Sequence, residues 1–415
     1  MTGVQTCALP IYHFILGRYN ADGSLNWEDY GGGIPIGGNY SGFREHLDFN
    51  GDNIPDVLTQ NSSGQWYASE NYGNSYVTTL SNFSFPVSEQ RQVLIGDFTG
   101  DGKDDMISQK VISGYGMMGP TVTAEWYLHA SNGNGTFTTS LFHTRPLYTN
   151  ATTSDPHVWV IGGMVGDFDN DGKDDIVGRH KLNNVWNDPT WVDEVVFSNG
   201  TSSTAVNQWI LPNTTNDPLP TLEGVGDFNG DGFDDVWGLR NLTVIVGPPM
   251  LSESRAAIWK GLSSGRGSSS QSGTMLAKPF AGMSFTTSQI DTRGSRAGRF
   301  DASADLIEDI VLEYSYSWNG TSYQELRVWK SGAVADIWAN SGRNGGEQFA
   351  MVGDLDRDGF DDLIWIGTTP SHNINLFVRS TVKTITWANS GIPISGNGVP
   401  SYIWTTNPRL RKRKP

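Results

Sequence analysis

One acidic segment recurs six times along this chain of 415 residues, and it limits what the chain can fold into more than any other feature. The copies are LDFNGDNIPDVL (47–58), GDFTGDGKDDMI (96–107), GDFDNDGKDDIV (166–177), GDFNGDGFDDVW (226–237), FDASADLIEDIV (300–311) and GDLDRDGFDDLI (353–364). Their first aspartates lie between 49 and 74 residues apart. A constant core at variable spacing indicates one structural unit per copy, with the length differences taken up by loops.

Each copy lies between stretches of strand character. Residues 93–95 and 363–366 are short apolar runs next to the second and sixth copies, and such runs are typical of buried strands. An aromatic segment that ends in a polar turn follows several copies: WYASEN from Trp66, WYLHASNGNG from Trp126, VFSNG from Val196 and WKSG from Trp329. This is a hairpin signature. Since Trp66, Trp126, Trp259 and Trp329 recur at one position of the unit, we expect them to pack between units.

Four strands for every 50–70 residues, roughly, is the period of a propeller blade. We therefore predict an all-β fold, a β-propeller of four-stranded blades over residues 12–404. About seven blades are represented, and six of them carry the acidic loop. Residues 12–47 contain the aromatic and glycine-rich pieces of a blade without an acidic loop, so we expect the propeller to be incomplete at both ends.

The two ends of the chain differ from the rest. Residues 1–11, MTGVQTCALPI, resemble the translation of a sequencing-adapter oligonucleotide, and we exclude them from the fold as an artefact. On this interpretation Cys7 is not natural, and a signal peptide was lost with the truncated start of the gene. Residues 405–415 form a basic tail that ends in RLRKRKP.

The acidic segments have the spacing of a calcium loop. Counted from the first aspartate, the third loop has Asp167, Asp169, Asp171 and Asp175 at positions 1, 3, 5 and 9. Together with a backbone carbonyl at position 7, these side chains can surround one hard cation with oxygen, and a flexible carboxylate-rich set favours Ca²⁺ over Zn²⁺ or Cu²⁺. Carboxylates this close repel one another strongly unless a cation lies between them.

We predict about six structural Ca²⁺ ions, one in each loop. The predicted ligand positions 1, 3, 5, 7 and 9 are, loop by loop, Asp48, Asn50, Asp52, Ile54 and Asp56; Asp97, Thr99, Asp101, Lys103 and Asp105; Asp167, Asp169, Asp171, Lys173 and Asp175; Asp227, Asn229, Asp231, Phe233 and Asp235; Asp301, Ser303, Asp305, Ile307 and Asp309; Asp354, Asp356, Asp358, Phe360 and Asp362. Thr99 and Ser303 are weaker ligands than a carboxylate. The fifth loop has Leu306 in place of the glycine expected at position 6, so its turn fits least well.

An EF-hand is the main alternative calcium motif, and two features argue against it. It requires a glutamate at position 12 and flanking helices. Position 12 is Thr59, Ser108, Gly178, Gly238, Leu312 and Trp365 in the six loops, and the flanks have strand character.

The segments GDFDNDGKDD and GDFNGDGFDD resemble FG-GAP/VCBS repeats, and the resemblance covers about residues 12–404. It implies a propeller in which the cation loops join the first two strands of each blade, as in integrin α-subunits and many bacterial surface proteins. The family also includes fungal lectins and the propeller-shaped domains of some polysaccharide lyases. Fold transfers across such a family, whereas function does not.

Charge and composition exclude several classes of function. The net charge of −16 disfavours binding to nucleic acid and to anionic membrane surfaces. No apolar run is long enough to span a membrane. Calcium loops of millimolar affinity suit the outside of a cell, so we expect an extracellular or cell-surface protein, and a monomer.

Two letter matches to catalytic motifs are dismissed on context. Residues 114–119 match a dinucleotide fingerprint, but Pro120 and a strand-like segment follow instead of a helix. Residues 261–265 match a nucleophile elbow within a Ser/Gly-rich turn. The seven histidines show no metal-binding spacing, and we expect His129 to be a blade-surface residue.

We therefore expect a non-catalytic module for adhesion or recognition, with an extracellular glycan or a protein as its ligand. The alternative is the propeller portion of a larger secreted carbohydrate-active enzyme, such as a polysaccharide lyase. Aromatic side chains in long insertions suit sugar stacking and protein interfaces. The candidate ligand-binding residues are Tyr115, Trp186, Trp191 and Trp318.

Overall fold

The structure of the protein is a computed structural model. It describes residues 15–19, 25–29, 40–52, 56–61, 64–72, 76–84, 93–116, 119–149, 163–183, 189–209, 221–246, 251–265, 269–276, 283–299, 307–329, 348–353, 362–368, 374–379 and 388–389. Within these ranges the chain is all-β, as predicted, and the only helical element is the short 3-10 turn Thr287–Gln289. Residues 1–11 and 405–415 lie outside the described residues.

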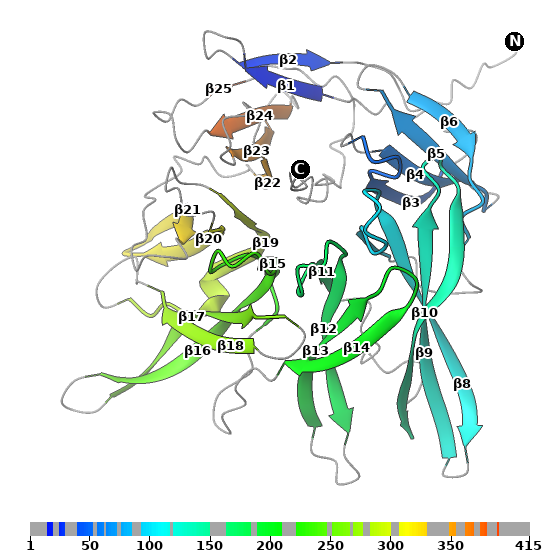
Figure 1. Cartoon of the computed structure of the whole chain (residues 1–415). Coiled ribbons are helices and arrows are strands. Elements are labelled where there is room, and N and C mark those ends of the chain that lie inside the picture. The colour runs from blue at the N-terminus through cyan, green and yellow to red at the C-terminus, as the bar shows by residue number, and fades with distance from the viewer. Residues whose placement is uncertain are drawn as a thin grey trace, which may run out of the picture.

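The strands form antiparallel sheets in chain order (Figure 1). A two-stranded sheet contains β1 (Ile15–Tyr19) and β2 (Leu25–Asp29). The first sheet contains β3 (Tyr40–Leu47), β4 (Asp56–Asn61), β5 (Trp66–Asn71) and β6 (Tyr76–Leu80). The second contains β7 (Leu94–Gly96), β8 (Asp105–Gly116), β9 (Gly119–Ser131) and β10 (Phe137–Thr149). The third contains β11 (Met164–Gly166), β12 (Asp175–Asn183), β13 (Pro189–Ser198) and β14 (Ser203–Trp209).

The remaining sheets follow the same plan. The fourth contains β15 (Gly224–Gly226), β16 (Asp235–Val246), β17 (Leu251–Ser263) and β18 (Ser269–Met275). The fifth contains β19 (Ile290–Gly298), β20 (Asp309–Trp318) and β21 (Thr321–Trp329). The sixth contains β22 (Gln348–Gly353), β23 (Asp362–Thr368), β24 (Ile374–Arg379) and β25 (Ala388–Asn389).

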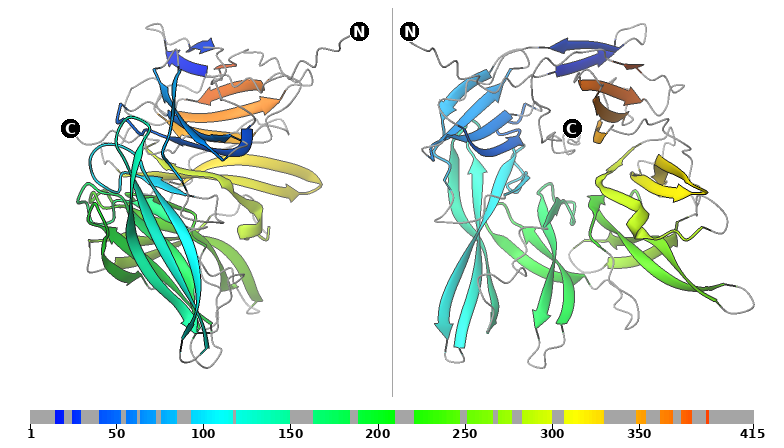
Figure 2. Two further views of the ribbon diagram at one scale, coloured as in Figure 1. Left: turned by 90° about the vertical axis from the view of Figure 1, so that its right-hand side faces the viewer. Right: turned by 180° about the vertical axis from the view of Figure 1, so that it is seen from behind.

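Each sheet is a meander in which consecutive strands are neighbours. From the second sheet to the sixth, the first strands β7, β11, β15, β19 and β22 contact one another in that order. The sheets thus follow one another around a common centre, and the views in Figure 2 agree on this arrangement.

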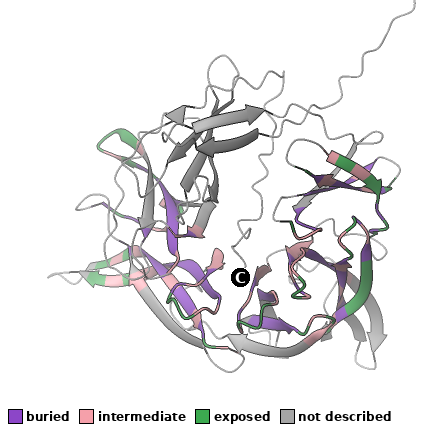
Figure 3. Ribbon diagram, turned by 45° about the horizontal axis from the view of Figure 1, so that its top comes forward, coloured by how far each residue is buried: buried purple, intermediate pink, exposed green. Residues whose placement is uncertain are grey.

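The hydrophobic core is divided into layers between neighbouring sheets. Phe49 and Trp66 of the first sheet pack in one cluster with Met106 of the second sheet. Ile176 and Val196 of the third sheet belong to the cluster around Phe98 and Trp126 of the second. The second, third and fourth sheets each pack against a neighbour on both sides, and buried residues run through the middle of their strands (Figure 3).

Candidate metal centre

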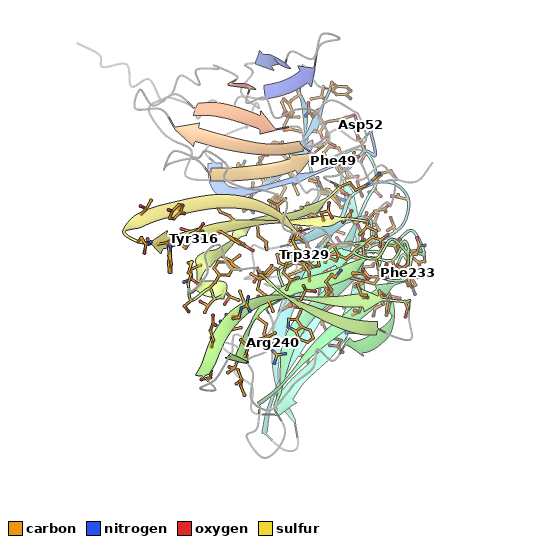
Figure 4. All side chains as sticks on the ribbon, turned by 90° about the vertical axis from the view of Figure 1, so that its left-hand side faces the viewer. Phe49, Asp52, Phe233, Arg240, Tyr316 and Trp329 are labelled. Atoms are coloured by element: carbon orange, nitrogen blue, oxygen red, sulfur yellow. The ribbon has the colours of Figure 1, made fainter. Side chains whose placement is uncertain are left out.

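Each acidic loop joins the first two strands of its sheet, as the resemblance implied, and position 9 is the first residue of the second strand. The first four loops are described almost completely, with Ile54 outside the described residues. Of the predicted ligands in the last two loops, Asp301, Ser303, Asp305, Asp354, Asp356, Asp358 and Phe360 lie outside them. Asp52 of the first loop and Phe233 of the fourth lie toward one side of the molecule, and Tyr316 lies toward the other (Figure 4).

Residues with positive φ give the loops their shape. Position 4 has a φ of 81° at Gly51, 75° at Gly100, 55° at Asn170 and 78° at Gly230. Position 6 is also left-handed, for example at Gly102 with a φ of 93°. Residues without a Cβ, and asparagine to a lesser degree, adopt this conformation at low cost. These two positions explain why the second and fourth loops read Asp-x-x-Gly-Asp-Gly.

The position 1 carboxylate accepts hydrogen bonds from the turn that follows it. In the second loop, Asp97 Oδ1 accepts from Gly100 N at 2.8 Å and Asp101 N at 3.1 Å, and Asp97 Oδ2 accepts from Gly102 N at 3.0 Å. Asp167 and Asp227 accept the same bond from position 6, at 3.1 and 2.9 Å. These bonds bend the loop around its first aspartate.

The position 9 carboxylates are buried at the start of the second strand. Asp56, Asp105, Asp175 and Asp235 are each fully inaccessible to solvent. Each accepts a hydrogen bond from the backbone at the end of the third strand: Asn71 N at 2.7 Å, Ser131 N at 2.8 Å, Ser198 N at 2.8 Å and Ser263 N at 2.7 Å. The other oxygen of Asp56, Oδ2, is buried without a hydrogen-bond partner among the described residues. Such an atom is costly to bury unless a cation or a donor meets it.

Burial raises the pKa of these carboxyls far above their usual range. It raises the pKa of Asp56 to about 8, of Asp105 to about 7, of Asp175 to about 9 and of Asp235 to about 8, and nearby loop carboxylates add to the effect. A buried carboxyl of this kind ionises readily only when positive charge lies beside it.

Three carboxylates converge in the third loop. Oxygen atoms of Asp167, Asp169 and Asp175, at positions 1, 3 and 9, lie within 4.8 Å of one another. Asp171 at position 5 instead forms an ion pair with the ammonium group of Lys173, at 3.0 Å, and Asp101 pairs with Lys103 in the same way. In the fourth loop, the amide of Asn229 donates to Asp231 at 2.9 Å.

These donor sets fit Ca²⁺. They consist of carboxylate, amide, hydroxyl and backbone oxygens, and in the first loop Asp56 Oδ2 is buried with no donor among the described residues. Positions 1, 3 and 9 already converge in the third loop. Position 5 would join them once the lysine ammonium, or the amide N–H group, turned away from its carboxylate.

The fifth loop differs from the others in strand register. In the second sheet Gly96 pairs with Asp105, so residues 97–104 form the connection. In the fifth sheet Gly298 pairs with Asp309, so residues 299–308 form a connection that is two residues longer. Asp309 nevertheless follows Asp301 by eight residues, as Asp105 follows Asp97, so the two additional residues, Arg299 and Phe300, precede the acidic segment. Asp301, Ser303 and Asp305 lie outside the described residues, and the fifth site stays a prediction.

The candidate ligand-binding residues fall in separate places. Tyr115 lies near the end of β8 and Trp191 lies in β13, and their two hairpins project in the same general direction (Figure 1). Trp318 ends β20 in the fifth sheet, where it is partly buried against the core. Trp186 lies outside the described residues.

The structure corrects two expectations about individual residues. His129 is not on a surface but fully buried, with Ser108 Oγ 2.8 Å from Nε2 and Thr139 Oγ1 2.9 Å from Nδ1. Of the four tryptophans expected at one position, Trp66 and Trp126 are equivalent in register, since they pair with Gln60 and Gln109.

Trp259 and Trp329 have different registers from that pair. Trp259 pairs with Gly238, which places it one residue out of register, on the opposite face of its sheet. There it lies partly exposed, with Arg240 5.2 Å from its ring centroid. Trp329 pairs with Ile310 and is buried in the core between the fourth and fifth sheets.

The letter matches to catalytic motifs have structural explanations. Residues 114–116 and 119 are the facing ends of the β8–β9 hairpin. Ser263, the central serine of the elbow-like match, is buried and donates its hydroxyl to the carbonyl of Phe168 at 2.7 Å. Neither segment leads into a helix within the described residues.

Sequence reasoning missed two polar positions that connect neighbouring sheets. One is position 8, the acid directly before the buried aspartate, and the other is the serine at the end of the third strand. The paired acids of the segments and the serine in the SNG turns were visible signals. Alone, however, neither distinguishes an intersheet contact from a solvated turn.

Comparison with known proteins agrees with the sequence resemblance. Residues 48–108 match the family model described as an FG-GAP-like repeat, a range that contains the first two acidic loops. A search of curated proteins gave no match. Among solved structures, the chain is similar to that titled "Crystal structure of AofleA from Arthrobotrys oligospora", at 12% identity and a TM-score of 0.34, over 84% of this chain and 85% of that chain. That likeness is too weak to assign a fold or a function. In its described part the chain has no helix long and apolar enough to cross a membrane. The family match confirms the FG-GAP-like resemblance over residues 48–108.

Proposed function

We propose that the chain is a β-propeller whose acidic loops bind structural Ca²⁺, and that it acts outside the cell, or on its surface, as a non-catalytic module that binds glycans or proteins. The sequential sheets with contacting first strands support the propeller. The observation that carries the calcium sites is the buried position 9 carboxylate, above all Asp56 with its unsatisfied Oδ2.

In the bound state, carboxylates at positions 1, 5 and 9 would hold the ion with the side chain of position 3 and the carbonyl of position 7. We propose a site in each of the six loops, including the fifth, which keeps the spacing of Asp301, Ser303, Asp305 and Asp309. Extracellular calcium modules bind at about 10⁻⁴–10⁻³ M, so at millimolar calcium each site contributes about 0.4–1.4 kcal/mol. Summed over several loops, this is comparable to the net stability of a domain.

Thermal unfolding with and without calcium tests this proposal. We expect the melting temperature in millimolar Ca²⁺ to exceed that in EGTA by several degrees, with recovery when Ca²⁺ is restored. Mg²⁺ at equal ionic strength is the control, because it demands a rigid octahedral site and should restore little. Equal melting temperatures in EGTA and in calcium would overturn the calcium proposal.

The binding role rests on the acidic body and on the projecting hairpins. A net charge of −16 disfavours nucleic acid, and we propose a monomer that presents its surface to an extracellular ligand. A glycan array probed with the wild type and with the combined alanine variant of Tyr115, Trp186, Trp191 and Trp318 tests the candidate residues. Loss of a specific signal in the variant supports them, and unchanged binding removes them.

A further inference from the structure

The acidic loops of neighbouring sheets are joined by a repeated pair of hydrogen bonds. Asp174, at position 8 of the third loop, accepts from Asp97 N of the second loop at 2.8 Å, and Asp174 N donates to Asp97 O at 2.8 Å. Asp104 makes both bonds to Asp48, at 2.7 and 2.8 Å. Asp234 makes both to Asp167, at 2.9 Å each. We call this contact the loop clasp.

The clasp joins groups that belong to different cation sites. Position 8 precedes the buried carboxylate of its own loop, and the residue that it holds is position 1 of the preceding loop. The series continues to the fifth sheet, where Glu308 N donates to Asp227 O at 2.8 Å. A side chain at Gly96 would place its Cβ 2.5 Å from Asp174 Oδ2, so the glycine before position 1 leaves the room that the clasp needs.

A serine makes a second connection between the same sites. Ser198 N donates to Asp175 Oδ1 of its own loop at 2.8 Å, while Ser198 Oγ donates to Phe98 O of the preceding loop at 2.6 Å. Ser131 and Ser263 repeat this pattern toward Phe49 and Phe168, at 2.6 and 2.7 Å. Positions 1 and 2 of each of the first three loops are thus held by the sheet that follows.

The loop backbones also approach one another directly. A Cβ at Gly51 of the first loop would lie 2.9 Å from the carbonyl oxygen of Gly102 in the second. A Cβ at Gly100 would lie 3.3 Å from the carbonyl oxygen of Gly172 in the third. Two loops this close cannot change shape independently.

From these contacts we infer that the loops bind Ca²⁺ cooperatively, each coupled to its chain neighbours, and that Asp104, Asp174 and Asp234 are positioning residues that carry the coupling. The inference rests on the proposed calcium sites. An ion in the third loop fixes Asp175 and hence the adjacent Asp174. Asp174 then holds Asp97 in place, so the second loop loses less conformational freedom when it binds its own ion. In repeat proteins coupling of this kind acts between nearest neighbours.

The test follows each loop separately by hydrogen–deuterium exchange of peptides that carry residues 97–105 and 167–175, at a series of free Ca²⁺ concentrations. Two variants disturb the third loop: Asp174→Asn removes the charge of the clasp, and Asp169→Asn weakens the third site without touching the clasp. Glu125→Gln on β9 is the matched control, because it removes one negative charge outside all loops.

We expect both third-loop variants to raise the calcium midpoint of the second-loop peptide fivefold or more, the lower end of typical coupling energies. Glu125→Gln should leave it unchanged. If Asp169→Asn raises the calcium midpoint of the third-loop peptide but leaves that of the second-loop peptide unchanged, the loops bind Ca²⁺ independently. That result overturns the coupling but not the calcium sites. Peptides in the wild type that show no calcium-dependent protection would overturn the calcium sites themselves. Asp169→Asn is informative even if Asp174→Asn fails to fold.

Discussion

At the scale of single residues, the two aspartates of an Asp-Asp pair, at positions 8 and 9 of a loop, have different roles although they are chemically identical. Asp175 is fully buried and binds the backbone of its own sheet, whereas Asp174 binds the sheet before it. The sequence analysis predicted Asp175 to be a calcium ligand, and this stays a prediction. It could not assign Asp174, because the difference arises only when successive sheets are packed together.

Ser198 tests how much one intersheet bond contributes. Ser198→Ala leaves the buried carbonyl of Phe98 without the hydroxyl that now donates to it. An unsatisfied buried acceptor costs about 1–3 kcal/mol, so we expect a lower free energy of unfolding by chemical denaturation. Ser202→Ala is the control, since the hydroxyl of Ser202 makes exposed contacts to the amide of Asn199, donating to Oδ1 at 3.4 Å and accepting from Nδ2 at 3.2 Å. Equal losses in the two variants would contradict the role of Ser198.

His129 gives a pH dependence at the same scale. Burial lowers the pKa of its imidazole to about 4, whereas the unfolded chain has an ordinary value of 6.5. The folded state therefore keeps the ring neutral while the unfolded state takes up a proton, and stability present above pH 6.5 is lost as the pH falls toward 4. The loss by pH 5 is roughly 2 kcal/mol.

His129→Gln removes the titrating group and keeps a side chain that can bond to Ser108. Thermal melts in saturating calcium should then show a smaller fall in melting temperature between pH 7 and pH 5 for the variant than for the wild type. Parallel curves for the two proteins would show that the imidazole stays charged or is not the responsible group.

At the scale of elements, strand order and loop position could be predicted from the sequence because each repeat contains its own signals. The start of the loop is marked by Gly-Asp-Phe, and the second strand is marked by the apolar pair that follows Asp-Asp. Register could not be predicted where a copy departs from that pattern. The fifth copy has Phe-Asp in common with the others, and this match concealed the two additional residues between Gly298 and Asp309.

The number of bound ions tests that difference in register. We expect Asp175→Asn to lower the calcium bound per chain by about one ion, because it removes a ligand from a loop with converging carboxylates. Asp309→Asn should have the same effect, since Asp309 follows Asp301 by eight residues, as Asp175 follows Asp167. Native mass spectrometry of calcium-loaded protein measures both. An unchanged number of ions in Asp309→Asn would remove the fifth site.

At the scale of the whole molecule, the acidic loops concentrate negative charge in one series of contacts. The net charge of −16 then opposes the compact state unless cations or salt reduce the repulsion. Sequence composition alone predicted this acidity. The alignment of the loops along neighbouring sheets required the structure, because the spacing of 49–74 residues does not show which loops touch.

Salt dependence of stability measures this repulsion. In EGTA we expect the melting temperature to rise as sodium chloride is increased from about 0.05 to about 0.5 M. Over this range the Debye length falls from about 13 Å to about 4 Å, which screens the repulsion between the loops. In saturating calcium the rise should be smaller, because the ions have already neutralised the loops. Sodium sulfate is not a suitable substitute, since it also strengthens hydrophobic burial. A salt effect of equal size in both buffers would contradict the neutralisation.

The serine and the position 8 acid of a sheet both reach backward, to the backbone of the sheet before it. Position 8 of the first loop is Pro55, which has neither a carboxylate nor an N–H group and so cannot form the clasp. A sheet copied by gene duplication would therefore carry the side chains of both contacts, the position 8 acid and the serine. The sheet before it would need to supply little more than main-chain atoms. Such an array can therefore gain, lose or exchange a sheet during evolution without new side-chain complementarity at these contacts.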